Sequence, residues 1–330
     1  MWLVTGATGH IGNVLVRELL RRGEKVRALL LPHESRLPIE GLGVEVAEGD
    51  VLDLQSLWQA LRGIRGVFHL AGLISIMPGE NALVQRVNVE GTRNLLEAAR
   101  RMKIRRLVYT SSIHALRRVQ AGIIDESVPY DSDNPYGAYD RAKAEATLEV
   151  QQAARQGLNA VITCPTGVIG PYDFRGSMMG EVIRTAAERK PALYVDGAYD
   201  FVDVRDVADG LIAAAARGRS GESYILSGQR ISVRYLLETV REITGRRFVK
   251  IKVPFDLAKL AARITPAYYR FAQQTPRFTP YALEVLRSNS HISHAKATRE
   301  LGYRPRNLYE SIADAVAWFL ERRRMARETG

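Results

Sequence analysis

The chain has 330 residues, 46% of them hydrophobic, which suits one large α/β domain or a nucleotide-binding domain with a smaller second lobe. The formal net charge of +11 is scattered along the chain, with one dense run at Arg322, Arg323, Arg324 and Arg327, so we expect no nucleic-acid partner. A single cysteine, Cys164, excludes a disulfide framework within the chain, and no cysteine and histidine spacing indicates a metal site.

Strands and helices alternate along the first half of the chain. No signal-peptide pattern precedes the first strand, and no run of about 18 apolar residues occurs, so we expect a cytoplasmic protein without a membrane span. The pattern predicts strands at 3–5, 26–31, 44–46, 66–70, 107–112 and 160–163, and helices at 13–22, 55–61, 83–103 and 139–156. The strands are almost continuously apolar and alternate with helices, which is typical of βαβ units and of a parallel sheet covered on both faces. We therefore expect a doubly wound, Rossmann-type α/β fold.

The second half is less regular and suggests a smaller C-terminal lobe. Residues 165–191 are loop-rich and then helical, 201–216 resemble a strand followed by a helix, and 223–226 form another short strand. We expect a nucleotide-binding core at 1–165, to which 200–227 return, and a substrate-binding lobe at 166–199 and 228–330. The aromatic stretch 253–280 (Phe255, Tyr268, Tyr269, Phe271 and Phe278) could be a lid, a dimer contact or a membrane-surface contact, although packing inside the lobe is favoured.

A glycine-rich turn follows the first strand. Gly6, Gly9 and Gly12 are spaced GxxGxxG, between a strand and a helix, and Thr8, His10 and Ile11 lie among them. Such a turn brings backbone N–H groups close to a pyrophosphate, and the helix N-terminus adds partial positive charge. The context predicts a dinucleotide-binding site.

The end of the second strand normally decides between NAD and NADP, through an acidic residue for the ribose or an arginine for the extra phosphate. Leu30 and Leu31 stand there and offer neither signal. His33, Ser35 and Arg36 follow and could meet a 2′-phosphate. With no carboxylate identified there, the sequence slightly favours NADP, with Arg36 as its ligand.

Tyr139 and Lys143 are spaced i and i+4, so on a helix they share one face. A phenol has a pKa near ~10, and we expect a neighbouring ammonium to lower it and to make the tyrosine an acid/base group. Tyr136 has no lysine four residues later. Ser112 follows Ser111 at the end of the fifth strand, where ligands bind in parallel sheets. Ser112, Tyr139 and Lys143 are therefore the candidate catalytic residues.

Taken together, these motifs resemble those of the extended short-chain dehydrogenases/reductases, over nearly the whole chain. The resemblance rests on residues 5–12 (TGATGHIG), 49–50 (GD), 69–72 (HLAG), 88–96 (NVEGTRNLL), 109–112 (YTSS), 201–207 (FVDVRDV) and the Tyr139 and Lys143 pair. The most similar members are the dihydroflavonol-reductase-like, 3β-hydroxysteroid-dehydrogenase-like and hopanoid-associated sugar-epimerase-like proteins.

The resemblance implies roles at the matching positions. Tyr139 would be the acid/base, Ser112 the catalytic serine, and Lys143 would also hold the nicotinamide ribose. Further cofactor contacts are implied at Asp50, Val51, Leu70, Ala71, Gly72, Thr110, Pro165, Thr166, Gly167 and Val168. Members often form dimers through the helix that carries the tyrosine and the long helix before it, so we expect a homodimer.

The expected activity is reversible hydride transfer between a nicotinamide and a ketone or secondary alcohol. The alternatives are an NAD-dependent sugar-nucleotide epimerase and a non-catalytic NADP-sensing protein, although a sensor has no need of the serine, tyrosine and lysine. Ile113 and His114 follow Ser112 where dehydratases carry an acidic pair, and Tyr199 replaces an arginine typical of nucleotide-sugar enzymes. His114 and Tyr199 are thus candidate substrate residues for an apolar or aromatic carbonyl compound.

Overall fold

The structure is a computed structural model, and it describes residues 1–75, 81–188, 191–245, 249–261 and 280–328. Seven parallel strands form the central sheet, in the order β10-β6-β5-β4-β1-β2-β3. These strands are β1 (Trp2–Thr5), β2 (Val26–Leu30), β3 (Glu45–Glu48), β4 (Gly66–His69), β5 (Arg106–Thr110), β6 (Ala160–Pro165) and β10 (Ser223–Leu226). The Rossmann-type fold predicted from the sequence is confirmed.

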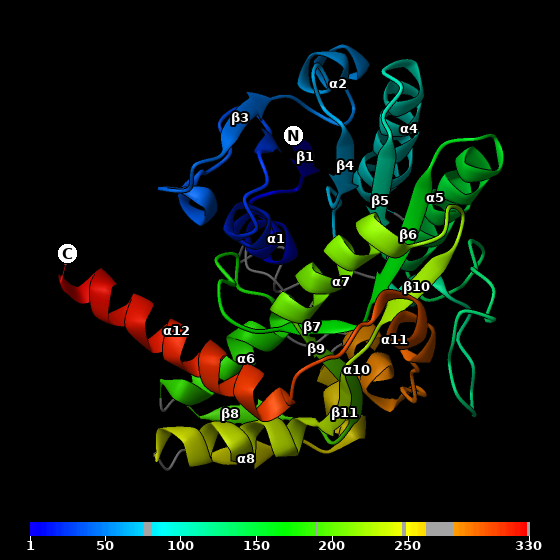
Figure 1. Ribbon diagram of the computed structural model, residues 1–330. Helices are drawn as coiled ribbons and strands as arrows, with labels where there is room; N and C mark the ends of the chain where they lie inside the picture. Colours follow the sequence, from blue (N-terminus) through cyan, green and yellow to red (C-terminus); the bar gives the residue numbers. More distant parts are fainter. Residues whose placement is uncertain (76–80, 189–190, 246–248, 262–279, 329–330) are drawn as a thin grey trace.

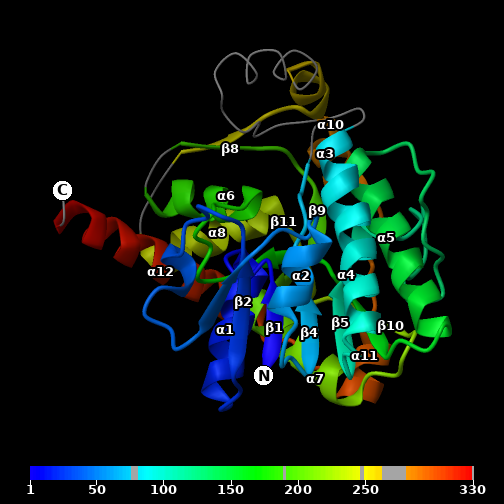
Figure 2. The ribbon, with the colours of Figure 1, turned by 90° about the horizontal axis from the view of Figure 1, so that it is seen from above.

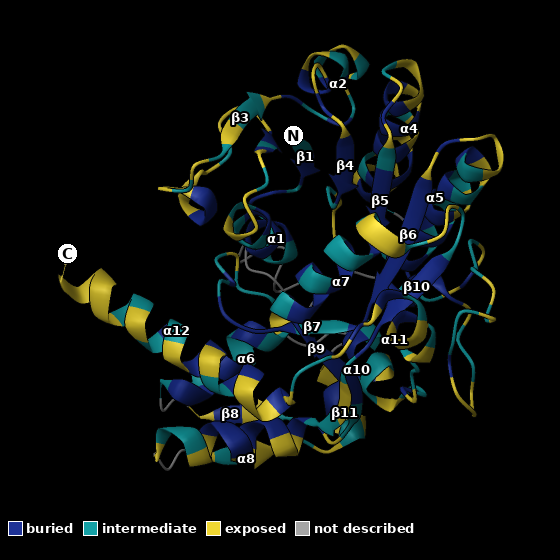
Figure 3. Ribbon diagram, viewed as in Figure 1, coloured by how far each residue is buried: buried dark blue, intermediate teal, exposed yellow. Residues whose placement is uncertain are grey.

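Helices cover both faces of the sheet, which explains why its inner strands are mostly apolar (Figures 2 and 3). One face carries α1 (His10–Arg21), α7 (Val204–Arg217) and α11 (Ala295–Leu301); the other carries α2 (Leu54–Ala60), α4 (Gly91–Arg101) and α5 (Ala138–Arg155). β1 lies between β2 and β4, so the glycine turn that follows it opens at the centre of the sheet's carboxyl edge.

The long helix predicted at 83–103 is interrupted. The structure has α3 (Ala82–Gln85), a π-helical turn at Arg86–Glu90 and then α4. Within the wide turn, the Asn88 amide donates to Val84 O and Leu73 O, both at 2.9 Å, and the Thr92 hydroxyl donates to Asn88 O at 2.6 Å. Side chains that bond to helix carbonyls interrupt the regular ladder, and periodicity alone does not reveal them. Asn88 therefore bonds to the backbone inside the fold.

The C-terminal lobe is built on two small sheets and three packed helices (Figure 1). β7 (Gly167–Ile169), β9 (Ala198–Asp203) and β11 (Gln229–Ser232) form one sheet, and β8 (Ala192–Tyr194) pairs with β12 (Lys250–Lys252). The helices are α6 (Met178–Ala187), α8 (Val233–Thr244) and α12 (Leu308–Glu328), and α10 (Pro280–Arg287) packs against β9. The strand predicted near 201 therefore belongs to the small sheet, whereas α7 and β10 belong to the main one.

Part of the aromatic stretch lies outside the described residues, namely Tyr268, Tyr269, Phe271 and Phe278. Phe255 is described: it is partly buried against Val195, Ala258 and Leu283, and the Arg287 guanidinium lies 4.2 Å from its ring centre. At this residue the stretch packs inside the lobe. None of the helices in the described ranges is long and apolar enough to cross a membrane.

Candidate active site

The turn between β1 and α1 has no room for side chains at two of its glycines. Gly6 has a φ of +68°, and a Cβ there would lie 2.8 Å from the backbone of Leu70 and Ala71. A Cβ on Gly12 would lie 2.0 Å from Gly6 O. α1 begins at His10 with no side-chain cap and no acidic residue in its first turn. Its N-terminal N–H groups and positive dipole end therefore suit an anion such as a pyrophosphate.

A buried histidine joins this turn to the next strand. His69 Nδ1 lies 2.8 Å from the Thr5 hydroxyl, and its Nε2 lies 3.1 Å from the Thr92 hydroxyl. Thr5 also accepts hydrogen bonds from the N–H groups of Leu70 and Ala71, at 3.2 and 3.0 Å. Burial lowers the pKa of His69 to about 3, so the ring is neutral at physiological pH. This histidine fixes the strand ends beside the turn.

We predict that His69 makes the protein less stable in acid. In the unfolded chain the ring takes a proton near its ordinary pKa of 6.5, whereas in the folded chain it stays neutral down to about 3. Between these values the unfolded state binds the extra proton, so stability falls with falling pH by up to about 1.4 kcal/mol per pH unit. The free energy of unfolding, measured with urea at several pH values across this window, should fall less steeply with falling pH for His69→Gln than for wild type. The exposed His291 supplies a matched control, His291→Gln; equal slopes for all three proteins would contradict this role.

The cofactor positions predicted beyond the turn lie at neighbouring strand ends. A Cβ on Gly72 would lie 2.5 Å from Asn88 Oδ1, so the chain passes close to the π-helical turn there. The Asp50 carboxylate, two residues beyond β3, accepts from Leu52 N at 2.9 Å, and Val51 packs against Gly91. These contacts hold Gly72, Asp50 and Val51 in place at the carboxyl edge of the sheet.

Ser112, Tyr139 and Lys143 meet beyond the end of β5. Strand β5 ends at Thr110, and Ser112 caps a short 3₁₀ turn at Ile113–Ala115, so the two serines follow the strand instead of ending it. Tyr139 and Lys143 lie one turn apart near the start of α5. Lys143 Nζ donates to Thr110 O at 2.6 Å, and Ser112 is close enough to the Tyr139 hydroxyl to lower the pKa of Tyr139. The predicted constellation is thus assembled in space.

The expected effect of Lys143 on Tyr139 is not found in the protein alone. Burial raises the pKa of Tyr139 to about 12, and the hydrogen bond from Ser112 opposes this only in part. Burial also lowers the pKa of Lys143 to about 7, because its ammonium is out of water and beside no carboxylate in the described contacts. Desolvation therefore outweighs the attraction that the i and i+4 spacing predicted.

His114 and Tyr199 form an aromatic wall beside these residues. His114 Nε2 lies 3.1 Å from the Tyr199 hydroxyl, and the rings stack with centres 5.8 Å apart. Burial lowers the pKa of His114. From α10, the Tyr281 hydroxyl donates at 2.7 Å to Asp140, the residue after Tyr139. The wall is therefore neutral and aromatic, and sequence reasoning missed Tyr281 because α10 is distant along the chain.

The segment Pro165–Thr166–Gly167–Val168 runs from β6 into β7, between the main sheet and the small one. The Thr166 hydroxyl donates to Asp200 Oδ1 at 2.7 Å, and Gly228 N donates to the same oxygen at 2.9 Å. Burial raises the pKa of Asp200 to about 6. This segment joins the two lobes by buried hydrogen bonds beside the site.

The structure revises the residues expected to meet the adenosine ribose. Arg36 Nη2 lies 3.0 Å from Glu48, and both side chains are exposed. A carboxylate does reach the turn: the Thr8 hydroxyl donates to Glu34 Oε1, and Leu31 N donates to Glu34 Oε2 at 2.9 Å. Glu34 stands four residues beyond β2, and a left-handed residue, His33 (φ 64°), helps to turn it back. The premise that no carboxylate is present after the second strand is therefore wrong.

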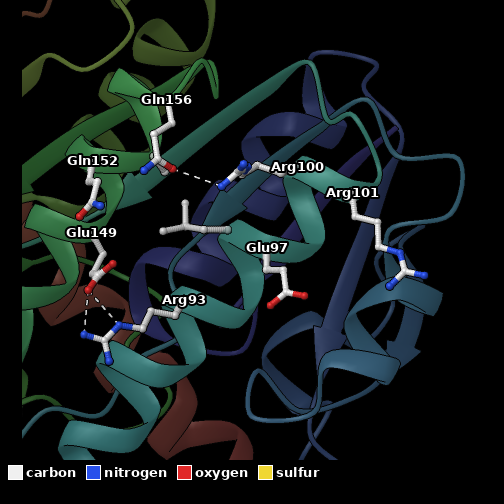
Figure 4. Close-up of a pocket in the computed structure, with 9 residues that line it drawn as sticks. Arg93, Glu97, Arg100, Arg101, Glu149, Gln152 and Gln156 are labelled. Carbon is white, nitrogen blue, oxygen red and sulfur yellow. Dashed lines mark hydrogen bonds and ion pairs between the residues drawn. The ribbon is translucent and has the colours of Figure 1, made fainter.

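One surface hollow of about 500 Å³ lies away from this site, between α4 and α5 (Figure 4). Arg93 there pairs with Glu149 at 2.7 Å, and Arg100 Nη1 lies 3.2 Å from the Gln156 amide oxygen. The hollow is lined by charged and amide side chains and carries none of the catalytic candidates.

The single cysteine, Cys164, is buried, and burial raises the pKa of its thiol to about 11, so the thiol is unreactive.

Residues 2–227 match the NAD dependent epimerase/dehydratase family. A relative from Methylococcus capsulatus, sterol demethylase protein B, is 38% identical over 322 residues, covering 97% of this chain and 98% of the relative. A 3 beta-hydroxysteroid dehydrogenase/Delta 5→4-isomerase from Mycobacterium tuberculosis is 31% identical, covering 92% of this chain and 85% of its own. The crystal structure of gox2253 is 33% identical, has a TM-score of 0.84 and is covered over 98% of both chains.

The chain therefore belongs to the NAD-dependent epimerase/dehydratase family, as the resemblance to extended short-chain dehydrogenases/reductases predicted. It is an enzyme, and the family and its dehydrogenase relatives identify it as an NAD(P)-dependent oxidoreductase. The glycine turn, with its close backbone contacts and uncapped helix, has the construction that such a cofactor needs.

Proposed function

We propose that the chain catalyses reversible hydride transfer between a nicotinamide cofactor and an apolar secondary alcohol or ketone. The observation that carries this proposal is the cluster of Ser112, Tyr139 and Lys143 beyond β5, on the same sheet edge as the glycine turn. When bound, the nicotinamide supplies or accepts the hydride. The protein aligns the substrate oxygen and moves its proton.

Each of the three residues has a separate task in this proposal. The Tyr139 hydroxyl passes a proton to or from the substrate oxygen, and its raised pKa keeps it protonated and ready to donate during reduction. Ser112, which lies close enough to Tyr139 to lower its pKa, orients the carbonyl. Lys143 is held by Thr110 O at 2.6 Å and can offer further N–H donors to the nicotinamide ribose.

The remaining cofactor positions follow the edge of the sheet. The pyrophosphate would lie on the turn formed by Gly6, Thr8, Gly9, His10, Ile11 and Gly12. Asp50 and Val51 would face the adenine, Leu70, Ala71 and Gly72 the middle of the cofactor, and 165–168 the nicotinamide. The sequence slightly favoured NADP because no carboxylate was identified after the second strand. Glu34 removes that argument, and the choice between NAD and NADP depends on this residue.

An apolar substrate is supported by the wall that Tyr199 and His114 form. Tyr199 uses its hydroxyl on His114 and offers no charge to a diphosphate, which is best bound by a guanidinium fork. The names of two relatives, sterol demethylase protein B and 3 beta-hydroxysteroid dehydrogenase, refer to steroids. We therefore place alicyclic alcohols of this kind first among candidate substrates.

We predict that one or more hydroxysteroids or smaller alicyclic alcohols will be oxidised with NAD or NADP, seen as the appearance of reduced nicotinamide. The same panel should contain UDP- and GDP-sugars, tested with cofactor present by thermal shift. We expect no stabilisation by these sugars, because the wall of His114 and Tyr199 leaves their diphosphate charge unmatched.

The second candidate is a sugar-nucleotide epimerase, in which Arg175, Arg205 or Arg234 would bind the diphosphate from another direction. A clear micromolar stabilisation by any nucleotide-sugar would replace the dehydrogenase proposal with the epimerase. Cofactor binding without turnover of any ketone, alcohol or sugar would contradict both enzymatic proposals.

The proposal also includes a homodimer in the cytoplasm. The dimer would form through α4 and α5, as in members that the sequence resembles. The exposed Leu148 on α5 and Leu83 on α3 offer apolar area for such a contact.

A further inference from the structure

A salt bridge from the C-terminal lobe reaches across to the glycine turn. Arg175, in the loop between β7 and α6, donates to the Thr8 hydroxyl at 2.7 Å and pairs with the Glu34 carboxylate. Thr8 donates to the same carboxylate oxygen. The Arg175 side chain is 60% exposed and that of Glu34 is 19% exposed. The pair therefore lies at the surface end of the turn, beside the proposed place of the adenosine ribose.

The loop that carries Arg175 is anchored by other contacts. His10 Nε2 lies 2.9 Å from Pro171 O, and the Asn13 amide donates to Tyr172 O at 3.1 Å. The Arg17 guanidinium lies 4.6 Å from the centre of the Tyr172 ring. Since these contacts hold the loop along α1, the Arg175 side chain can turn away from Glu34 while the loop stays in place.

We propose that Arg175 and Glu34 together set the choice between NAD and NADP, with Glu34 binding the ribose hydroxyls of NAD and Arg175 binding the additional phosphate of NADP. The inference rests on the proposed function, because it requires the dinucleotide to lie on the glycine turn. A carboxylate accepts hydrogen bonds from ribose hydroxyls and repels a phosphate, whereas a guanidinium binds a phosphate through two parallel N–H donors.

The exposure of Arg175 makes this exchange of partners feasible. Its side chain is 60% exposed, whereas Glu34, at 19%, also accepts hydrogen bonds from the Thr8 hydroxyl and Leu31 N. Arg175 can therefore move from the carboxylate to a phosphate without leaving Glu34 unpaired. When Arg175 stays on Glu34, it neutralises the carboxylate and reduces its repulsion of NADP. The chain should therefore accept both cofactors with modest discrimination.

Arg36 provides a matched control within the same region. It is the arginine that the sequence favoured, but it pairs with Glu48, and the side chains are 58% and 59% exposed. The guanidinium that contacts Thr8 belongs to Arg175. We therefore expect a substitution of Arg175, but not one of Arg36, to change the binding of NADP.

The test is calorimetric titration of NAD and of NADP into four proteins: wild type, Arg175→Gln, Glu34→Gln and Arg36→Gln. For Arg175→Gln we expect the Kd for NADP to rise by about tenfold or more and that for NAD to change by less than about threefold. For Glu34→Gln we expect NAD to bind more weakly and NADP more tightly. Arg36→Gln should leave both values unchanged.

Arg175→Lys separates an effect on cofactor selectivity from an effect on folding. It keeps the positive charge but not the planar guanidinium, so it should bind NADP more tightly than Arg175→Gln and more weakly than wild type. Thermal unfolding of each variant without cofactor checks the fold. The proposal is overturned if the ratio of the two Kd values in Arg175→Gln and Glu34→Gln equals that of wild type, or if Arg36→Gln alone changes it. If wild type binds neither dinucleotide, the proposed function fails as well, whereas an unchanged ratio in a protein that binds them defeats this inference alone.

Discussion

Tyr139→Phe should lower kcat by about 10²–10⁴-fold and leave the Kd for the cofactor nearly unchanged. The substitution removes one oxygen atom, the group that we propose moves the substrate proton, and keeps the ring that packs at the start of α5. Ser112, Lys143 and the glycine turn all remain. Steady-state kinetics with the best alcohol of the panel give kcat, and calorimetric titration gives the Kd.

Tyr136→Phe is the matched control, because Tyr136 lies three residues earlier and its ring faces a charged group. The Arg118 guanidinium lies 3.5 Å from the centre of the Tyr136 ring, and a phenylalanine ring preserves that contact. Its effect on kcat should be small. If Tyr136→Phe abolished turnover and Tyr139→Phe did not, the catalytic tyrosine would be misidentified.

The core of the fold could be predicted because its local and long-range signals agree. The inner strands of the sheet are buried on both faces, so their sequences are mostly apolar, and glycines mark the turn after β1. The pair Tyr139 and Lys143 needs only helical spacing to meet. These features lie within a few residues of one another in the sequence, and the structure keeps them together.

Features that depend on distant segments could not be predicted in the same way. Glu34 reaches Thr8 only because the turn at His33 has a positive φ, and Arg175 reaches Glu34 from 141 residues further along the chain. The strands β7, β8, β11 and β12 have three or four residues each, too few for a periodic pattern. In α12 the buried residues Ile312, Val316 and Phe319 recur at helical spacing, but the arginines that follow them dominated the sequence interpretation.

The pKa prediction failed for a related reason. Spacing along a helix indicates which side chains are neighbours, but it does not give their burial. In the folded chain Tyr139 and Lys143 are both removed from water, and desolvation disfavours the charged form of each. Burial therefore favours the neutral forms of both side chains. Lys143 donates its hydrogen bond to Thr110 O, an acceptor that the helical spacing does not reveal.

Gly12→Ala should weaken cofactor binding by about 10²-fold or more. A Cβ at this position would lie 2.0 Å from Gly6 O and 2.9 Å from Ala7 Cα, both backbone atoms that no rotamer change can move. The turn and the start of α1 must separate, which withdraws N–H groups from the pyrophosphate. Losing two charge-assisted hydrogen bonds, at about 1.5 kcal/mol each, corresponds to that factor.

Two further variants show whether this effect belongs to the turn. Gly43→Ala is the control for adding a methyl group, because a Cβ there has no atom within 4 Å and the backbone has no positive φ. It should bind the cofactor as wild type does. At Gly9 a Cβ would lie 3.2 Å from Gly6 O, which small shifts can accommodate, so Gly9→Val should fold and still block the approach of the pyrophosphate. Calorimetry then distinguishes the cases: unchanged binding by folded Gly9→Val and Gly12→Ala would mean that the dinucleotide does not lie on this turn.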